Sequence, residues 1–466
     1  MKNTITKAIL TTILFIGYLF NGVYAQKVYS LTVNQAVDYA YKNSIQVKNA
    51  LLDIQVQQQT NREVTAAAYP QLNASGSLGY NPNVAVSTFP NFIAAATYGV
   101  LVANGVKDKN GNTIVAPADF GFIQAGFGTK YASSVGVDLA QLLFDGQVFV
   151  GLLARKTTID FARKSVEVTQ EQIKTNIYKI YYQLVIGRKQ VESIDANITR
   201  FEKLLHDTKE IYKNGFAEKL DVDKVDVQLS NLKTEKIKAE NQLEAGNEGL
   251  KFLMNMPQKD RLILMDTISV DLIKSNILDT AYDYSNRKEY QQLILGTKLN
   301  RYNVKRYQLS KVPTLSLSAN YNKNKQSQQF DVFTGPYFTS SFIGLRINTP
   351  LFDGGARNAR IARAKLEVQR SLNNMDLLKA SIDNDVAQSV SRIHSALITL
   401  ESQQRNITLA EQVYLSTKLK YEQGLGSNQE IYTAQTELQI AQNNYYGSLY
   451  DAINAKIDFL RTAGKL

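Results

Sequence analysis

The chain lacks cysteine and tryptophan altogether, and only two of its 466 residues are histidine. Disulfides and thiolate metal sites are therefore excluded, so a secreted chain of this kind must be held together by burial or by oligomerisation. His206 and His394 each lie inside a helical pattern, and no His, Asp and Glu cluster has the spacing of metal ligands. A Gly-rich phosphate loop, a nucleophile elbow and a paired-carboxylate motif are missing as well. We expect no metal site, no cofactor and no enzymatic activity.

Long apolar runs are equally scarce, and the one from Ala8 to Phe20 lies near the start of the chain. Two lysines precede it and the small residues of Val23-Tyr24-Ala25 follow it, which is typical of a secretory signal peptide at 1–25. A membrane anchor is the alternative, but the run is shorter than the roughly 20 residues that a spanning helix needs. The expected mature chain begins at Gln26, without a cysteine to carry a lipid. Later windows are too polar for a spanning helix, so a role in a membrane would require strands.

The first part of the mature chain changes from helical to alternating periodicity. Thr32 is a candidate N-cap for a helix through about Asn43, and a second helix is expected to end near Ala68. From Leu72 to Leu78 apolar and polar residues alternate, which predicts a strand with one apolar face. The following segment, 81–130, is rich in Gly, Pro, Asn and small apolar residues and predicts a long loop, with turn signals that allow a hairpin of its own.

A second alternating segment around 135–139 ends in Leu143-Phe144-Asp145-Gly146, where helical periodicity begins. Apolar residues then recur at alternating steps of three and four, as in a coiled-coil seam, interrupted only at Gly187 and Thr208. One helix over 147–213 would be about 100 Å long at roughly 1.5 Å per residue, which no compact domain contains. A turn and a return helix are expected to follow.

The second half of the chain repeats this order of elements. Leu351-Phe352-Asp353-Gly354 copies the earlier junction, and an alternating strand around 343–347 precedes it. The loop before that strand is expected to be short, from Tyr321 to Tyr337, and the second long helix to span 356–422. The order helix, strand, loop, strand, long helix, turn and helix is thus present twice, which indicates an internal duplication. The expected repeats are 26–257 and 258–466.

The turn between the last two helices of each half has the same residue types. Glycine suits the end of a helix because it adopts the left-handed conformation without steric cost. In both copies a tyrosine precedes the glycine, an aromatic or aliphatic residue follows it, and an acid opens the return helix. The corresponding residues are Tyr212, Gly215, Phe216 and Asp221 in the first turn and Tyr421, Gly424, Leu425 and Glu430 in the second.

The four expected strands are too few for a barrel made by one chain. A closed barrel that spans a membrane takes at least eight strands. An open sheet in lipid would leave edge groups without hydrogen bonds, at several kcal/mol for each group. A barrel must therefore be shared between chains. The soluble alternative is that the four strands form a small cap on a helical bundle.

The duplicated plan, the two Leu-Phe-Asp-Gly junctions and the two Tyr-x-x-Gly turns followed by an acid resemble the TolC-like outer-membrane efflux proteins. The resemblance covers essentially the whole mature chain, and Ala434, Leu438 and Ala441 continue the family's pattern after the second turn. It implies an α+β membrane protein that forms a homotrimer. Three times four strands would form a shared 12-stranded barrel in the bacterial outer membrane, and long coiled-coil helices would form a tunnel through the periplasm.

The resemblance also implies a function and partners. The chain would be the channel-tunnel component of a tripartite efflux or type I secretion system, and it would conduct substrates passively to the exterior. Its partners would be outer membrane lipid, a periplasmic adaptor (membrane fusion) protein and an inner-membrane pump, with no nucleic acid. The cargo stays open between drugs, metals, peptides and proteins, because the pump largely selects it.

Individual residues carry over from the family by their position in the two turns. The aperture acids would be Asp221 and Glu430, the residues packed at the aperture Tyr212 and Tyr421, and the adaptor-docking tips Gly215, Phe216, Gly424 and Leu425. The family's basic lock residue would fall at Gly426 and a second acid at Thr433, so the chain departs from the family at the lock. Lys219 and Lys224 are candidate replacements.

Two alternatives accompany this interpretation. Asp221 and Glu430 also fit plain helix-start acids, which the helix dipole favours, and both roles can hold together. The alternative function is a non-conducting structural or adaptor coiled coil of the cell envelope. An adaptor would need a lipoyl-like β domain between the halves of its hairpin, and the sequence contains no such segment.

Overall fold

The computed structural model describes residues 27–275, 281–331 and 333–466, so the predicted signal peptide lies outside the described residues. The chain forms two compact units. One contains the described residues up to Gln58 together with those of Lys156–Arg301 and Leu366–Leu466, and the other contains the described residues of Gln59–Arg155 and Tyr302–Lys365. Each unit combines segments of both halves of the chain, whereas the predicted repeats follow the chain order and stay a prediction.

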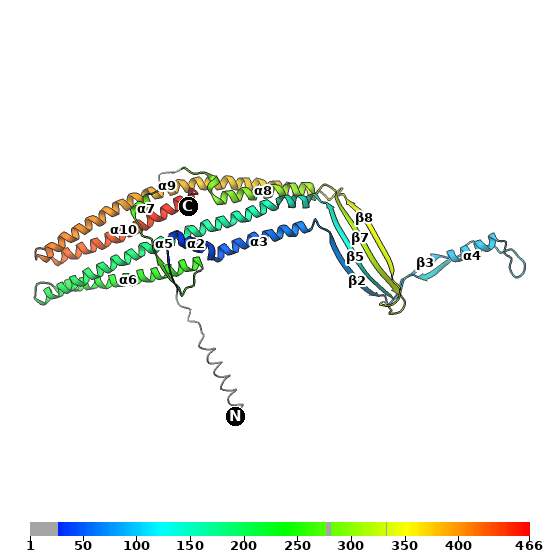
Figure 1. Ribbon diagram of the computed structural model, residues 1–466, viewed down its shortest axis with the longest axis horizontal. Coiled ribbons are helices and arrows are strands. Elements are labelled where there is room, and N and C mark those ends of the chain that lie inside the picture. The colour runs from blue at the N-terminus through cyan, green and yellow to red at the C-terminus, as the bar shows by residue number, and fades with distance from the viewer. Residues whose placement is uncertain (1–26, 276–280, 332) are drawn as a thin grey trace, which may run out of the picture. The chain divides into compact units, whose positions relative to one another are not determined.

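Helices make up most of the described chain (Figure 1). The two long helices predicted at 147–213 and 356–422 are confirmed, and the first of them is a single helix of 68 residues. The helices of the first half are α2 (Val33–Asn43), α3 (Ile45–Ala66), α5 (Gly146–Lys213) and α6 (Lys219–Met254). Those of the second half are α8 (Lys288–Leu309), α9 (Ala356–Glu422) and α10 (Asn428–Thr462).

The predicted N-cap of α2 is confirmed by its hydrogen bonds. The backbone N–H of Gln35 donates to Thr32 Oγ1 at 3.3 Å, and the backbone N–H of Thr32 donates to Gln35 Oε1 at 2.9 Å. This reciprocal capping box satisfies two N–H groups that a helix start otherwise leaves without partners. The helix therefore begins where the sequence indicates.

The core of the first unit lies where α2, α5, α6 and α10 meet. Ile173, Ile177 and Tyr181 of α5 are fully buried there, together with Met254 at the end of α6. The three residues of α5 belong to its predicted apolar seam or lie directly beside it. The seam is therefore a packing surface within one chain. Burial of such side chains contributes about 1.5–3 kcal/mol each.

A small parallel strand pair that the sequence analysis did not predict closes this core. β1 (Val28–Leu31) pairs with β6 (Arg261–Leu264), and the short helix α7 (Val270–Lys274) follows. The hydroxyl of the buried Tyr181 donates to the carbonyl of Leu31 at 2.9 Å and accepts the N–H groups of Met265 and Asp266. Burial raises the pKa of Tyr181 to about 12, so it stays protonated and keeps this donor.

The second unit contains an open antiparallel sheet of four strands. The strands are β2 (Gln71–Tyr80), β5 (Tyr131–Phe144), β7 (Thr314–Ser327) and β8 (Phe338–Asn348), in the spatial order β2-β5-β7-β8. All four strands expected from the sequence are therefore present. Within the described residues β2 and β8 are the two edges, and nearly every residue of both is exposed.

The register of this sheet separates an apolar face from a polar one. One row across all four strands is Leu72, Leu139, Ala319 and Ile343. A row on the opposite face is Ser75, Gly136, Asn322 and Ser340. Because directly opposed residues of antiparallel strands lie on the same face, the alternation read from each strand adds up to two chemically distinct faces.

The predicted loop from Tyr321 to Tyr337 is wrong in its first part. β7 continues through Ser327 and pairs with β5 on one side and, as far as Asn324, with β8 on the other. Residues 320–327 are almost entirely polar, and a polar run without alternation indicates a loop. Pairing with two neighbouring strands overrides that local signal, because it satisfies the backbone groups of the segment.

The predicted long loop at 81–130 is wrong in its lack of structure, although its own hairpin is confirmed. β3 (Val86–Pro90) pairs antiparallel with β4 (Phe122–Gly126), and a helix, α4 (Phe92–Ala103), lies between them. Asn91 caps that helix by accepting the N–H of Ala94 at 3.0 Å. The twelve residues of α4 are apolar except for Thr97, so they gave no helical period and the helix was missed. We call this segment, 81–130, the extension.

None of the helices in the described parts of the chain combines the length and hydrophobicity that crossing a membrane requires.

Candidate functional site

Both helix turns that the sequence analysis singled out have the same backbone geometry. Gly215 has φ +78° and Gly424 has φ +72°, in the left-handed region where glycine costs least. In the first turn the N–H of Phe216 donates to the carbonyl of Ile211, and in the second the N–H of Leu425 donates to the carbonyl of Lys420. With the N–H bonds of the two glycines, these are Schellman motifs, which end a helix by satisfying its last carbonyls.

The residue after each glycine is held out into solvent. Phe216 is 85% exposed and Leu425 is 77% exposed. A Schellman motif is often accompanied by packing of this residue against the preceding helix, and here both side chains stay largely uncovered. Each turn therefore presents one large apolar side chain at its end.

The two predicted acids lie at equivalent places, the third position of each return helix. The carboxylate of Asp221 accepts the backbone N–H of Glu218 at 3.4 Å, in a capping box at the start of α6. The backbone N–H of Glu430 donates to Ser427 Oγ at 3.2 Å at the start of α10. Both acids thus have a structural role at a helix N-terminus, where the dipole favours negative charge. Glu430 is exposed and Asp221 is partly exposed.

The two predicted aperture tyrosines differ in their surroundings. Tyr212 is exposed, whereas Tyr421 is half-buried and its hydroxyl donates to Asn428 Oδ1 at 2.8 Å. Burial and the negative charge of Asp207 raise the pKa of Tyr421. The hydroxyl of the fully buried Thr208 also reaches Asn428 Oδ1, at 3.3 Å. Asn428 therefore ties the end of α9 and the body of α5 to the start of α10.

The two hairpins are joined along α5 and α10. The rings of Phe201 and Tyr432 meet edge to face at 6.1 Å between centroids. Lys203 Nζ lies 3.4 Å from the carboxylate of Glu422, an exposed ion pair between the hairpins that contributes at most about 1 kcal/mol. Both turns consequently belong to one packed group of helices.

The family's lock residues have no direct equivalents at this site. Thr433 donates its hydroxyl to the carbonyl of Gln429, and a side chain at Gly426 would approach the backbone N of Tyr421 to 3.1 Å. Of the candidate replacements, Lys224 lies on the same helix as Asp221, with 3.9 Å between its Nζ and the carboxylate. Lys219 is exposed at the first position of α6.

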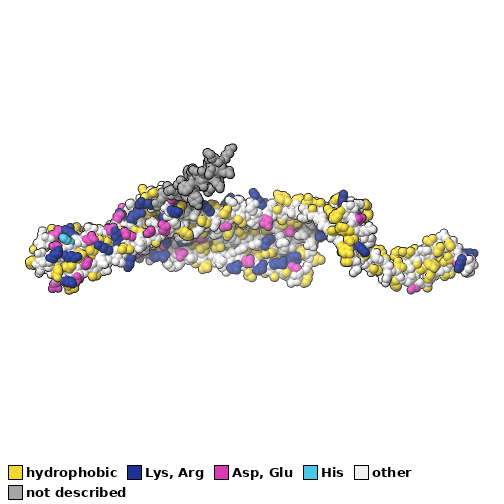
Figure 2. Space-filling model, turned by 90° about the horizontal axis from the view of Figure 1, so that it is seen from below, with side chains coloured by type: hydrophobic (Ala, Val, Ile, Leu, Met, Phe, Trp, Pro, Cys, Tyr) yellow, Lys and Arg dark blue, Asp and Glu magenta, His cyan; other side chains and the backbone are white. Residues whose placement is uncertain are grey.

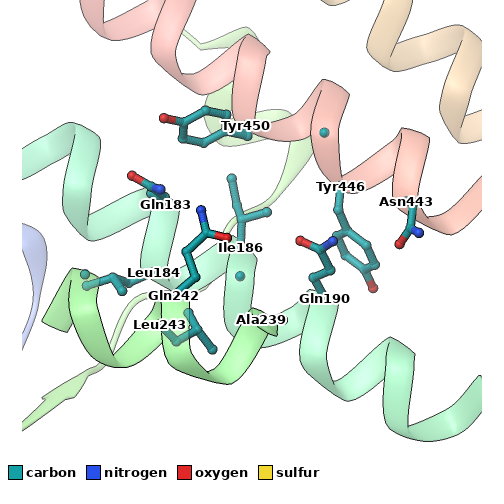
Figure 3. Close-up of a pocket in the computed structure, with 13 residues that line it drawn as sticks. Gln183, Leu184, Ile186, Gln190, Ala239, Gln242, Leu243, Asn443, Tyr446 and Tyr450 are labelled. Atoms are coloured by element: carbon teal, nitrogen blue, oxygen red, sulfur yellow. The ribbon is translucent and has the colours of Figure 1, made fainter. Parts of the chain in front are cut away.

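A pocket farther along the helices was missed by the sequence analysis. It has a volume of about 250 Å³ and lies between α5, α6 and α10, with polar and aromatic side chains around it (Figure 3). Its lining includes Gln183, Gln190, Gln242, Asn443, Tyr446 and Tyr450. The three helices are far apart in sequence, so no local motif marks the pocket. Gly187 is the one residue in the sequence that could have indicated the pocket. It interrupts the apolar seam of α5, and it lines the pocket.

No group of three or more His, Cys, Asp and Glu residues that could hold a metal ion occurs in the described residues. The geometry instead consists of paired helix ends, exposed apolar tips and carboxylates at helix starts.

Comparison with known proteins finds a family and several relatives that this chain resembles. Residues 284–465 match the family model "Outer membrane efflux protein". The outer membrane protein TolC of Vibrio cholerae is 20% identical over 339 residues, which cover 72% of this chain and 77% of that protein. The proteases secretion protein PrtF of Dickeya chrysanthemi is 19% identical over 308 residues, covering 64% of this chain and 65% of that one. These matches indicate a TolC-like outer membrane efflux protein.

A solved structure extends the likeness to nearly the whole chain. The chain superposes on CusC with a TM-score of 0.73 at 16% identity, over 95% of this chain and 94% of that one. The crystal structures of CusC concern conformational changes that accompany its folding and the formation of a transmembrane channel. The likeness confirms the predicted fold class of long helices with a few barrel-type strands.

Proposed function

We propose that this protein is the trimeric outer-membrane channel of a tripartite efflux or type I secretion system. It conducts substrates passively from a periplasmic adaptor and an inner-membrane pump to the exterior. The observation that carries the proposal is the four-stranded sheet, which has one apolar face, one polar face and two open edges. The described residues of one chain neither close this sheet nor cover its apolar face.

Three copies remove both problems at once. If β2 of one copy pairs with β8 of the next, the edges are satisfied and twelve strands close into a barrel. The apolar face then contacts lipid and the polar face lines a water-filled interior, as in outer-membrane barrels. The adaptor alternative fits less well, because only the short turns 214–218 and 423–427 separate the helices of each hairpin.

In the trimer, Asp221 and Glu430 form rings of carboxylates around the threefold axis at the periplasmic aperture. Two carboxylates about 8 Å apart repel each other by roughly 0.5 kcal/mol in water, and several-fold more where protein lowers the dielectric constant. Such rings favour cations at the constriction. We therefore expect the channel to be cation-selective, although the chain has a formal net charge of +11.

The test is the reversal potential of the purified trimer in a planar bilayer under a salt gradient. The double substitution Asp221→Asn with Glu430→Gln removes both charges, and an asparagine can still accept the N–H of Glu218. We expect reduced cation selectivity and weaker block by multivalent cations added on the periplasmic side. An unchanged selectivity and block would limit both acids to their role at the helix starts.

A matched control is available on α6. Asp223 and Asp226 lie two and five residues after Asp221, which turns them about 200° and about 140° around the helix within about two turns of it. The control Asp223→Asn with Asp226→Asn removes the same net charge, and we expect it to leave the selectivity close to that of the unmodified trimer.

A further inference from the structure

The extension between β2 and β5 differs in composition from the rest of the chain. Residues 64–106 contain no charged side chain, and the first charges appear at Lys107, Asp108 and Lys109, in the turn beyond α4. The extension nonetheless has regular, hydrogen-bonded structure. β3 and β4 pair along their full length, and the N–H of Asn81 donates to the carbonyl of Lys130 at 2.7 Å where the extension leaves the sheet.

The helix α4 has no charged side chain and is apolar except for Thr97, whose hydroxyl donates to the carbonyl of Ile93, and none of its residues is buried. One face, with Ala94, Tyr98 and Leu101, is half-covered by the returning chain, where the ring of Tyr98 lies 5.7 Å from that of Phe120. A second face is uncovered. Ile93 and Val100 are 59% and 62% exposed, and Figure 2 shows hydrophobic side chains gathered over the extension. A helix that is hydrophobic all round is normally buried.

The uncovered face has the spacing of a helix–helix seam. Ile93, Ala96, Val100 and Ala103 follow one another at steps of three, four and three, and all four are exposed. This is the spacing of the positions that two or three helices bury against one another in a coiled coil. The small alanines alternate with branched residues, so helices can approach closely along this face.

A lipid surface fits α4 less well than other copies of the chain do. Helices that lie in a membrane interface have a charged or strongly polar face rich in Lys and Arg, and α4 has neither. Its 12 residues are also too short to span a bilayer. The extension follows directly from β2, the edge strand that meets a neighbouring copy in the proposed barrel. It leaves the sheet at the C-terminal end of β2, whereas α3 precedes the N-terminal end. In the proposed channel the helices lie in the periplasm, so the C-terminal end of β2 is the outer end.

We propose that, in the trimer, the α4 helices of three copies pack on one another through the stripe Ile93, Ala96, Val100 and Ala103. They form an apolar cap at the outer mouth of the barrel. The inference rests on the proposed trimeric channel, because it needs three extensions around one axis. The charged turn at 107–109 then stays in water, at the end of α4 away from the sheet.

The absence of cysteine makes the test direct, because a single introduced thiol has no competitor. Val100→Cys places the thiol on the stripe. Val102→Cys is the control: it replaces another valine of the same helix and places the thiol about 140° away from the centre of the stripe. Each variant is first shown to be a trimer by its mass in detergent, and is then oxidised to form disulfides.

We expect a disulfide-linked dimer for Val100→Cys, containing at most two thirds of the chains, because three thiols in a trimer can form one disulfide. Val102→Cys should remain unlinked and should react freely with a water-soluble maleimide. A trimer in which neither variant is linked, or both are linked equally, overturns the cap. A variant that is monomeric before oxidation overturns the trimeric channel itself, so the two failures are distinguishable.

Discussion

Phe216 and Leu425 are large apolar side chains held in water by a rigid turn. A Schellman motif fixes the backbone of each turn, and in both turns the side chain after the glycine stays exposed instead of packing on the preceding helix. Exposed apolar side chains at a protruding tip are typical of contact sites for another protein. We propose that these two residues are the parts of the turns that a periplasmic adaptor covers.

Replacing Leu425 by Asp should therefore uncouple the channel from its pump. A buried apolar anchor in an interface is worth about 2 kcal/mol or more, which corresponds to a roughly 30-fold loss of adaptor affinity. We expect pump-dependent efflux to fall to background in cells while trimer formation and insertion in the outer membrane stay normal. Gln423→Glu adds a charge in the same turn without removing an apolar side chain, and it should leave efflux close to normal. Full efflux by the Leu425→Asp variant would show that the tips dock elsewhere.

Thr208 shows what a sequence pattern cannot reveal at the scale of one residue. It interrupts the apolar seam of α5, yet it is fully buried. Its hydroxyl donates to the carbonyl of Leu204 at 2.7 Å and reaches Asn428, and this satisfied polar group is the reason that burial is tolerated. The partner lies 220 residues away in the chain. The turn glycines and the acids were predictable because their causes are local.

At the scale of elements, Gly187, the other interruption of the seam, lies at a close contact between α5 and α6. A Cβ atom at Gly187 of α5 would lie 2.8 Å from Leu243 Cδ2 of α6, and one at Gly246 of α6 would lie 2.7 Å from Leu184 Cδ2 of α5. Each glycine thus receives a leucine of the opposite helix. This reciprocal packing sets the spacing of α5 and α6 beside the pocket in Figure 3.

We predict that Gly187→Val destabilises the protein by about 1–3 kcal/mol, because a branched side chain forces Leu243 to move from its packed position. Gly249→Val is the matched control on α6, where an added Cβ meets nothing within 4 Å. Thermal unfolding in detergent measures both variants. Equal midpoints for the two would show that α5 and α6 are not held together at Gly187.

The elements that could be predicted from sequence are those with a strong period or a local cap. The two long helices, the four strands of the sheet and the capped start of α2 belong to this group. α4 was missed because a helix that is apolar on all sides has no amphipathic period. The end of β7 was missed because strand pairing, rather than alternation, stabilises a polar segment. β1 and β6 have only four residues each, which is too short for an alternating pattern to be recognised in the sequence.

At the scale of the whole molecule, the proposed channel requires that three chains share one barrel. Within a chain the sheet has two open edges and an uncovered apolar face, and the extension has an uncovered helix face. The number of strands in one chain predicted that a barrel must be shared between chains. The register of the sheet adds a second reason, because one face of the sheet is apolar and the other is polar. The proposed aperture and the proposed cap both follow from the same threefold axis.

The most direct test of the shared barrel is the mass of the purified mature protein in a mild detergent, measured by native mass spectrometry or by light scattering corrected for bound detergent. We predict a particle of three chains that loses solubility when detergent is removed, because the apolar face of the shared barrel is then exposed to water. A monomer that stays folded and soluble in detergent-free buffer would contradict the shared barrel, and with it the channel.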